Sequence, residues 1–326
     1  MPPRRIAVRS FITTVLFILA IAHTAIAETH PPIRKSFNVS PGGRLTIDSD
    51  LGSIEIRSGA QSRVDVEVQR ETRGRSDLDR FEVDMRQRGN EVEVRGEYDR
   101  GSLGWLDAGR LKVKYVVTVP EQFNVDLKTS GGSITVSSLT GAVDARTSGG
   151  SIHAGAVRGD VSARTSGGTI RVDKSSGSVT ATTSGGSIRI GEAGGAVEAR
   201  TSGGNIAIVR SGADIVAKTS GGSISIDAGG GRLDAKTSGG SITARMTTAP
   251  RESWSLATSG GSIRLAVPGT ARFDLDAKTS GGRVTSNVPV TVQGELRKNL
   301  LQGAVNGGGP RVVLRTSGGG ISIERQ

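Results

Sequence analysis

The chain has no cysteine, only three histidines and only ten aromatic side chains among its 326 residues. Without cysteine it can form no disulfide, thiolate zinc site or cysteine nucleophile, and it lacks the lipidated cysteine of a bacterial lipoprotein. Ten aromatic rings are too few for the thick core of a typical enzyme domain of this length. We therefore expect a thin, aliphatic interior.

Glycine is the residue in excess, with 48 copies beside 10 prolines. This is roughly twice the average glycine usage, but the two residues together stay below the level typical of low-complexity disorder. Lys and Arg number 42 against 31 Asp and Glu, which gives a net charge of +11. That balance favours anionic partners, such as acidic polysaccharide, anionic lipid or nucleic acid, without selecting one.

The N-terminus has the pattern of a secretory signal. Arg4, Arg5 and Arg9 precede an apolar run from Phe11 to Ile21, and small residues follow up to Ala27. The alternative is a membrane anchor, but polar residues interrupt the run. We expect cleavage of residues 1–27, which lowers the net charge from +11 to +8 because three arginines are removed. The mature chain would have no transmembrane segment and would be exported, either to the periplasm or beyond the cell.

A tetrapeptide, Thr-Ser-Gly-Gly, recurs every 18 residues from Thr129 to Thr237. It returns at Thr258 and Thr279 after steps of 21, and at Thr316 after a step of 37, close to two periods. A glycine also recurs every 9 residues from Gly132 to Gly240, broken only by Ala213. We expect these glycines to permit positive φ at tight corners. The predicted structural turn glycines are Gly132, Gly150, Gly168, Gly186, Gly204, Gly222 and Gly240.

Apolar residues between these turns recur at a spacing of two, which is the period of a half-buried strand and not of a helix. One half of each repeat pairs large residues, as in Ile188 and Ile190, and the other pairs a large residue with alanine, as in Val143 and Ala145. Each 18-residue unit therefore predicts two short strands and two turns. Stacked units give an all-β, two-sheet β-solenoid, of the β-helix or β-roll type.

Residues 28–122 are less periodic but also strand-like. Residues 44–56 look like an early, degenerate coil, and residues 81–85 with 92–98 predict a hairpin about Gly89-Asn90. Because a solenoid end exposes unpaired strand edges, it needs a cap. The predicted organisation is a signal peptide at 1–27, a β-rich N-terminal cap with early coils at 28–122, and a solenoid repeat domain at 123–326.

Several segments resemble a bacterial family of unknown function whose members carry the label "putative adhesin". They are the opening from Ser36 to Leu45, the strand from Tyr115 to Pro120, the Thr-Ser-Gly-Gly-Ser-Ile turns, and the closing segment from Asn306 to Ile321. The resemblance implies a β-solenoid protein of the cell envelope with no catalytic residues to transfer. This chain departs from the pattern by having Ser-Gly-Gly where Asn-Gly-Asp is expected in many relatives, which removes a turn carboxylate.

The residue before each Thr-Ser-Gly-Gly is basic in eight of ten repeats. By strand parity these side chains point outward, and stacking would align them about 4.8 Å apart in a cationic ladder. Such a ladder is a candidate site for a polyanion, although acids two residues earlier, such as Asp126 and Asp144, partly neutralise it. The simpler interpretation is a solvated face. The candidate ligand-binding residues are Lys128, Arg146, Arg164, Arg200, Lys218, Lys236, Lys278 and Arg315.

Other chemistries have weaker support. Calcium-binding β-rolls need turn carboxylates, and the turns here have none. A carbohydrate-active enzyme needs clustered acids, but the nearest stacked pair, Asp126 and Asp144, has basic neighbours that predict ion pairing. His153 has no second metal ligand in register. Trp254 is predicted to pack in the core or the cap, and Trp105, in a glycine-rich excursion at 101–109, is a candidate surface contact. Ser and Thr columns resemble those of ice-binding solenoids, but charged residues interrupt them.

The sequence thus predicts a non-enzymatic, exported, adhesin-like or structural module of the cell envelope that contacts anionic polysaccharide or lipopolysaccharide through the ladder. The alternative is a carbohydrate-active β-helical enzyme of the envelope. We expect no cofactor, no metal and no specific nucleic-acid partner.

Overall fold

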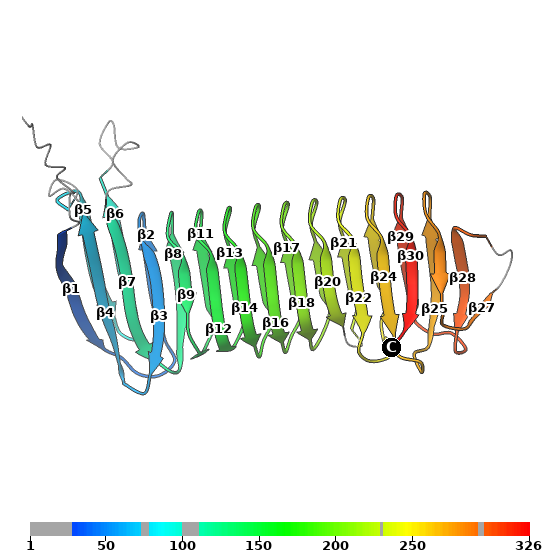
Figure 1. Ribbon diagram of the computed structural model, residues 1–326. Coiled ribbons are helices and arrows are strands. Elements are labelled where there is room, and N and C mark those ends of the chain that lie inside the picture. The colour runs from blue at the N-terminus through cyan, green and yellow to red at the C-terminus, as the bar shows by residue number, and fades with distance from the viewer. Residues whose placement is uncertain (1–27, 73–77, 100–110, 229–230, 293–296) are drawn as a thin grey trace, which may run out of the picture.

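The computed structural model describes residues 28–72, 78–99, 111–228, 231–292 and 297–326, and every regular element in these ranges is a β-strand. The predicted signal peptide, the excursion at 101–109 and Trp105 lie outside the described residues. Two 15-stranded sheets, sheet A and sheet B, face each other along an elongated rod (Figure 1). The predicted all-β solenoid of two sheets is confirmed. In the described ranges no helix is long and apolar enough to cross a membrane.

In the regular middle of the rod, each turn of the solenoid adds one strand to each sheet. Residue n lies beside residue n + 18 in parallel register, as for Val143 and Val161 in sheet B and Ile152 and Ile170 in sheet A. The sheet A strands are β9 (Ile134–Val136), β10 (Leu139–Thr140), β12 (Ile152–Arg158), β14 (Ile170–Ser175), β16 (Ile188–Ala193), β18 (Ile206–Ser211), β20 (Ile224–Ala228), β22 (Ile242–Met246) and β24 (Ile263–Val267). The sheet B strands are β8 (Phe123–Thr129), β11 (Val143–Thr147), β13 (Val161–Arg164), β15 (Val179–Thr182), β17 (Val197–Arg200), β19 (Ile215–Lys218), β21 (Leu233–Lys236) and β23 (Trp254–Thr258).

The interior is a thin aliphatic layer, as the scarcity of aromatic residues predicts. Sheet A contributes large side chains such as Ile188 and Ile190, whereas sheet B alternates valine with alanine, as in Val161 and Ala163. All four are at most 2% exposed. Large residues on one sheet face small ones on the other, so the two sheets approach closely without needing rings to fill the space.

The repeat glycines are required by stacking and not by backbone torsion. Of the glycines spaced by nine, only Gly141 has a positive φ, of 146°. A Cβ on Gly168 would lie 2.0 Å from the carbonyl oxygen of Gly150 in the preceding coil, and one on Gly186 would lie 2.0 Å from that of Gly168. The expectation of positive φ at these corners is therefore wrong: consecutive turns stack so closely that no side chain fits between their backbones.

The threonine of each Thr-Ser-Gly-Gly turn is buried and joins neighbouring coils. Thr165 Oγ1 donates to the carbonyl oxygen of Gly150 at 2.8 Å and accepts from the N–H of Gly168 at 3.3 Å. The same pair of bonds recurs at Thr147, Thr183, Thr201, Thr219 and Thr237. These bonds satisfy polar atoms that the turn would otherwise bury without partners.

The N-terminal end departs from sequence order. It contains β1 (Glu28–Asn38), β2 (Gly43–Ser49), β3 (Ser53–Gly59), β4 (Arg63–Thr72), β5 (Phe81–Arg88), β6 (Glu91–Tyr98) and β7 (Lys112–Pro120). β2 and β3 form the predicted early coil, but that coil lies between β6–β7 and β8–β9, which come later in the chain. The predicted hairpin is confirmed as the antiparallel pair β5–β6. The antiparallel strands β1, β4 and β5 complete this end of the rod.

The C-terminal end repeats this arrangement. It contains β25 (Phe273–Thr279), β26 (Val284–Ser286), β27 (Val290–Val292), β28 (Leu300–Val305), β29 (Arg311–Thr316) and β30 (Ile321–Arg325). The last coil, β29–β30, is inserted between β23–β24 and β25–β26 (Figure 1). The 37-residue step from Thr279 to Thr316 therefore contains β26, which completes the outer coil, and the antiparallel strands β27 and β28, after which the chain returns as β29 to fill the gap.

Candidate functional site

The predicted basic side chains form one column on the outer face of sheet B. Lys128, Arg146 and Arg164 lie in direct register, and Arg200, Lys218 and Lys236 continue the column after Thr182. Because the last coil is inserted, the column then runs from Ala257 to Arg315 and only afterwards to Lys278. The structure brings all eight candidates together on one face, in an order that differs from the sequence at the C-terminal end.

Five of the eight cations have a carboxylate partner on the same face. Lys128 Nζ lies 3.0 Å from Asp48, Lys218 Nζ lies 3.0 Å from Asp234, and Arg315 lies 2.5 Å from Asp276. Arg146 pairs with both Asp126 and Asp144, and Arg200 pairs with Glu198. Much of the ladder is thus neutralised, as the acids two residues earlier predict.

The other three cations, Arg164, Lys236 and Lys278, are exposed, and within the described ranges no carboxylate lies within 4.0 Å of them. Arg164 donates only to the hydroxyl of Ser162, at 3.3 Å. Four strand spacings separate Arg164 from Lys236, about 19 Å, and three separate Lys236 from Lys278, about 14 Å. Such spacing suits an extended polyanion better than a single small anion.

The strongest charge cluster on sheet B lies at the inserted coil. Asp276 on β25 is 7% exposed and accepts hydrogen bonds from Arg311 at 2.8 Å, Arg315 at 2.5 Å and Gln302 at 2.8 Å. Burial alone would raise the pKa of Asp276, but the hydrogen bonds from Arg315, Gln302 and Arg311 outweigh it and hold the pKa well below its usual range. Asp276 lies two residues before Lys278, as Asp126 and Asp144 lie before Lys128 and Arg146. The sequence gives no sign that the chain returns to supply Arg311 and Arg315 as its partners.

Sheet A carries a shorter charged column of His153, Arg171 and Arg189. His153 Nε2 and Arg171 Nε lie 2.8 Å and 2.7 Å from the carboxylate of Asp173. Burial opposes ionisation of Asp173, but these two hydrogen bonds prevail and lower its pKa. In the described part of the chain no three His, Asp or Glu side chains converge as a metal ion would require.

The two stacked acids that the sequence offers to a hydrolase, Asp126 and Asp144, are engaged in ion pairs. Asp126 and Asp144 lie in register, and Arg146 contacts both of them. Trp254 is 1% exposed and donates from Nε1 to the carbonyl oxygen of Gly231 at 3.0 Å, so its predicted core position is correct.

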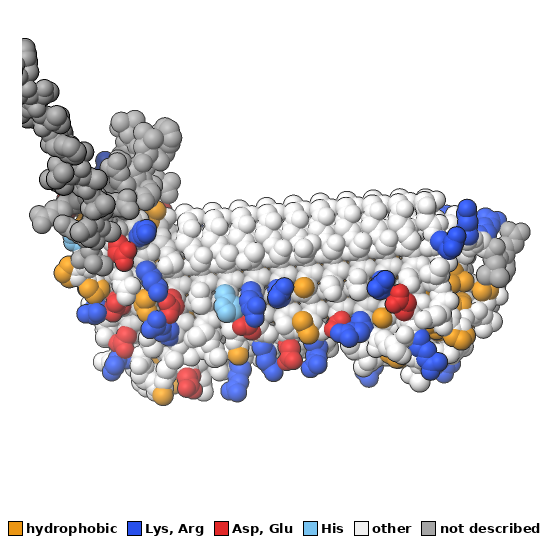
Figure 2. Space-filling view, viewed as in Figure 1, with side chains coloured by type: hydrophobic (Ala, Val, Ile, Leu, Met, Phe, Trp, Pro, Cys, Tyr) orange, Lys and Arg blue, Asp and Glu red, His pale blue; other side chains and the backbone are white. Residues whose placement is uncertain are grey.

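The edge of the rod formed by the Thr-Ser-Gly-Gly turns is distinct from both sheet faces. Figure 2 shows it as a smooth band over the coils with no charged or hydrophobic side chain, whereas charged side chains gather on the face of sheet A below it. The cation column lies on the outer face of sheet B, so the candidate site also occupies a sheet face and not the glycine-rich edge.

Among solved structures, 14 chains match this one. A "putative adhesin" from Bacteroides fragilis is 12% identical over 91% of this chain and 97% of its own, with a TM-score of 0.38. A "putative cell adhesion protein" from Clostridium sporogenes is 11% identical over 91% and 100%, with a TM-score of 0.21. A "putative lipid binding protein" from Parabacteroides distasonis is 12% identical over 90% and 96%, with a TM-score of 0.29.

No curated protein matches the chain. The sequence model described as Toastrack DUF4097 matches residues 43–324, which includes the early coil, the regular repeats and the inserted last coil. The chain belongs to the Toastrack DUF4097 family.

Proposed function

We propose that the protein is an exported, non-enzymatic, adhesin-like module of the cell envelope that holds an anionic polysaccharide or the phosphate groups of lipopolysaccharide along sheet B. The observation that carries the proposal is the cation column, in which Arg164, Lys236 and Lys278 are exposed and have no carboxylate partner among the residues that the structure describes. A long anion lying along the rod can contact all three at once, and multivalent contact raises affinity above that of any one ion pair.

The fold supports a binding role in a second way. Parallel strands, hydrogen-bonded from one coil to the next, keep the column at a fixed spacing. Binding therefore does not have to order the backbone of the site, which would lower the affinity. Asp126 and Asp144, the stacked acids that the sequence singles out, are both held by Arg146, so they are not free to act as general acid and base. This disfavours the alternative of a carbohydrate-active enzyme.

A matched pair of triple variants tests the site. Arg164→Gln with Lys236→Gln and Lys278→Gln removes the three unpaired cations of the column. Arg158→Gln with Arg189→Gln and Arg251→Gln removes three exposed cations elsewhere, so the loss of net charge is the same. Retention on immobilised anionic polysaccharide, and separately on lipopolysaccharide, is measured in a salt gradient. The first variant should elute at clearly lower salt than the second, and equal elution of the two would reject the column as the site.

Export is tested independently of binding. The full chain is expressed in a bacterial host, the periplasm and medium are separated from the cytoplasm, and the N-terminus of the exported protein is sequenced. We expect the mature chain to begin at Glu28, directly after Ala27. Recovery of the intact N-terminus in the cytoplasm would contradict export.

A further inference from the structure

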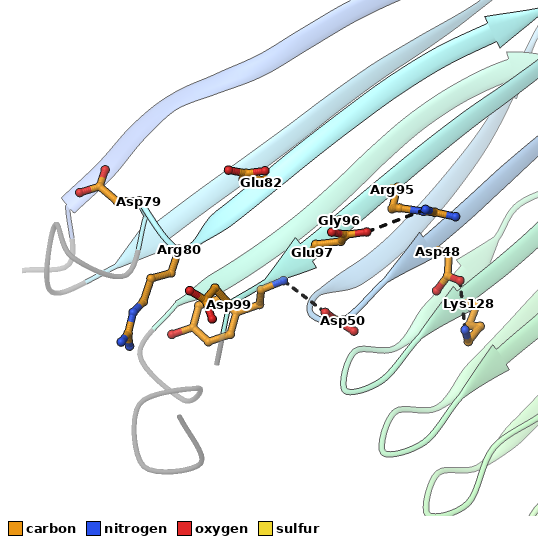
Figure 3. Close-up of a pocket in the computed structure, with 11 residues that line it drawn as sticks. Asp48, Asp50, Asp79, Arg80, Glu82, Arg95, Gly96, Glu97, Asp99 and Lys128 are labelled. Carbon is orange, nitrogen blue, oxygen red and sulfur yellow. Dashed lines mark hydrogen bonds and ion pairs between the residues drawn. The ribbon is translucent and has the colours of Figure 1, made fainter. Parts of the chain in front are cut away.

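A cavity of about 570 Å³ beside the β5–β6 hairpin and the end of β2 is lined mainly by acids. Figure 3 shows Lys128 paired with Asp48, and the N–H of Tyr98 donating to Asp50. The other acids that line the cavity are exposed, so water solvates them. Because its acids are satisfied by the chain or by water, the cavity by itself indicates no ligand. A different feature of the same end of the rod, on β1, does.

The first three residues of β1 are paired separately from the rest of the strand. Glu28–His30 lie opposite residues 70–72 of β4, and the register then shifts at a bulge before Ile33. Pro31 and Pro32 occupy this bulge and have no N–H to donate to β4. Because the pairing from Ile33 to Asn38 does not depend on the first three residues, they can leave β4 while the rest of β1 stays in place.

Buried polar atoms are left without partners where this end of β1 meets β4. His30 Nε2 and Arg70 Nε are buried, and neither has a hydrogen-bond partner among the residues that the structure describes. The two residues lie directly opposite each other. Buried polar atoms in folded proteins nearly always have a partner, and each one left without a partner lowers stability. The cross-strand pair that holds the beginning of β1 is therefore poorly satisfied, and little stabilises the imidazole of His30 where it lies.

Export would make His30 the third residue of the mature chain. Cleavage after Ala27, as proposed for export, leaves Glu28 with a free α-amine. The amine, the backbone nitrogens of Thr29 and His30, and the imidazole Nδ1 then follow one another along the chain, so they can surround one ion in a plane through fused chelate rings. A square plane of nitrogen donors is typical of Cu(II) and Ni(II). Proline at either inner position would remove a backbone donor, but the first proline after the cleavage site is Pro31.

We propose that the N-terminus of the exported chain binds one copper(II) ion, or nickel(II) in the same geometry, through the amine of Glu28, the backbone nitrogens of Thr29 and His30, and His30 Nδ1. The inference rests on the cleavage point proposed for export, but not on the cation column. The ion displaces the protons of the two amides, and any proton on the amine, and these pass to solvent. Binding therefore strengthens as the pH rises. Only one side chain takes part, so the site does not depend on a cluster of ligating side chains, and the described residues contain none.

The chelate takes only one of its two amides out of the sheet. Consecutive N–H groups of an antiparallel strand point to opposite sides, so only one of the Thr29 and His30 amides faces β4. β1 is the outermost strand of sheet A, so the other amide faces away from the sheet. Binding also separates the poorly satisfied pair of His30 and Arg70. The loss of strand pairing is thus confined to the end of β1 before the bulge.

Titration with Cu(II) at neutral pH tests the proposal on protein exported from the full chain, with the first residue of each variant identified by mass. Free histidine is present as a competitor, and the visible absorption of the bound ion is recorded. A chain that begins at Glu28 should bind one Cu(II). Thr29→Pro keeps the imidazole but removes a backbone donor, and should weaken binding about a hundredfold or more, because linked donors act at a high effective concentration. Thr29→Ala, the matched control, keeps the N–H and should bind as the wild type does.

The histidine variants and the cleavage point separate the possible failures. His30→Ala should abolish binding, whereas His153→Ala, at the other histidine of the mature chain, should leave it unchanged. Equal affinity in Thr29→Pro and Thr29→Ala would overturn the backbone site. A chain that begins at Glu28 and does not bind Cu(II) would overturn this inference and leave export intact. Cleavage at any other bond, or no export, would overturn both.

Hydrogen exchange reports the release of the strand end. Cu(II) should speed up exchange of those amides of residues 70–72 that face β1, and should leave residues 63–68, opposite the rest of β1, unchanged. The Thr29→Pro variant should show no such response to Cu(II). Full protection of residues 70–72 in the copper-loaded wild type would overturn the proposed geometry.

Discussion

The middle of the rod and its two ends are built from the same kind of coil but are assembled by different rules. Between β11 and β22 every coil stacks on its predecessor in the sequence. At each end a coil is inserted between two others: β2–β3 between later coils, and β29–β30 between earlier ones. The middle is therefore held by local, repeated contacts, whereas each end is closed by strands that are distant in sequence.

Insertion also places both terminal coils inside the rod. A simple stack of coils would leave its first and last coils with one unpaired edge each, open to pairing with another chain. Here β2–β3 and β29–β30 are paired on both sides. Three of the four outermost positions are taken by the antiparallel strands β1, β5 and β27, and the fourth by the short strand β26, which is parallel to β30. β1, one of these edge strands, contains Pro31 and Pro32, which lack the N–H that a further strand would need.

Two deletions should give the largest difference in stability, one at the C-terminal end of the rod and one in its middle. Removing residues 311–326 takes away four buried side chains, Val312, Leu314, Ile321 and Ile323, worth on the order of 8 kcal/mol. It also leaves β23–β24 and β25–β26 facing a gap. Removing residues 165–182 takes away one whole period and joins Arg164 to another Thr-Ser-Gly-Gly turn. Urea unfolding should show severe loss of stability in the first and a folded, shorter rod in the second; equal losses would contradict the comparison.

Within the middle, the close stacking of turns predicts a sharp contrast between adjacent glycines. Gly168→Ala places a Cβ 2.0 Å from a backbone oxygen of the preceding coil and should cost about 3 kcal/mol, because backbone cannot move aside. Gly167→Ala meets nothing closer than 3.6 Å and should be nearly neutral. Chemical denaturation of both variants measures the difference. Similar losses for the two would mean that torsion, and not steric contact, selects glycine here.

Loss of the Asp276 carboxylate at the inserted C-terminal coil should reduce stability more than loss of a carboxylate from an ion pair in a middle coil. Asp276→Asn weakens the bonds to Arg311 and Arg315 and should cost about 2 kcal/mol, because the side chain of Asp276 is only 9% exposed. Asp144→Asn changes a carboxylate that is 32% exposed, so it should cost about 0.5 kcal/mol or less. Thermal unfolding of both variants checks the ranking.

The same carboxylate gives a pH dependence with a definite sign. Because folding lowers the pKa of Asp276 below its ordinary 3.8, the stabilisation is complete above that value and is lost as the pH falls below it. Asp276→Asn should remove this part of the acid sensitivity. An unchanged difference in stability between the wild type and Asp276→Asn from pH 6 down to pH 2 would contradict it.

The smallest effect is expected at the turn threonines of the middle. Thr165→Val keeps the shape of the side chain but loses the bond to Gly150 and leaves the N–H of Gly168 without its acceptor, at a cost of about 1 kcal/mol. Ser166→Ala, at an exposed position of the same turn, should change stability little. Hydrogen exchange of the Gly168 amide should speed up in the threonine variant alone.

The regular part of the fold was predictable because each residue type recurs at a fixed position of the 18-residue coil, where its neighbours in sequence determine its structural role. Glycine every nine residues and an aliphatic residue two positions later predict the strands, the turns and the alignment of the basic side chains. The reason for the glycines was predicted wrongly, since the clash that selects them is with another coil and is invisible within one turn. The pairing of five ladder cations followed from the nearby acids only in part: Asp48, the partner of Lys128, lies 80 residues away.

The sequence by itself determined the coil, its 18-residue register and the outward column of cations, because these depend on side chains within one or two periods. Only the tertiary structure decided the order of the coils at the ends, the partners of Asp276, and the acidic cavity between β2 and the β5–β6 hairpin. The physical reason is that all coils share one pattern of inward and outward residues. Each coil fits beside many others, so the order at the ends is set by connections and charges that meet only when distant strands pack together.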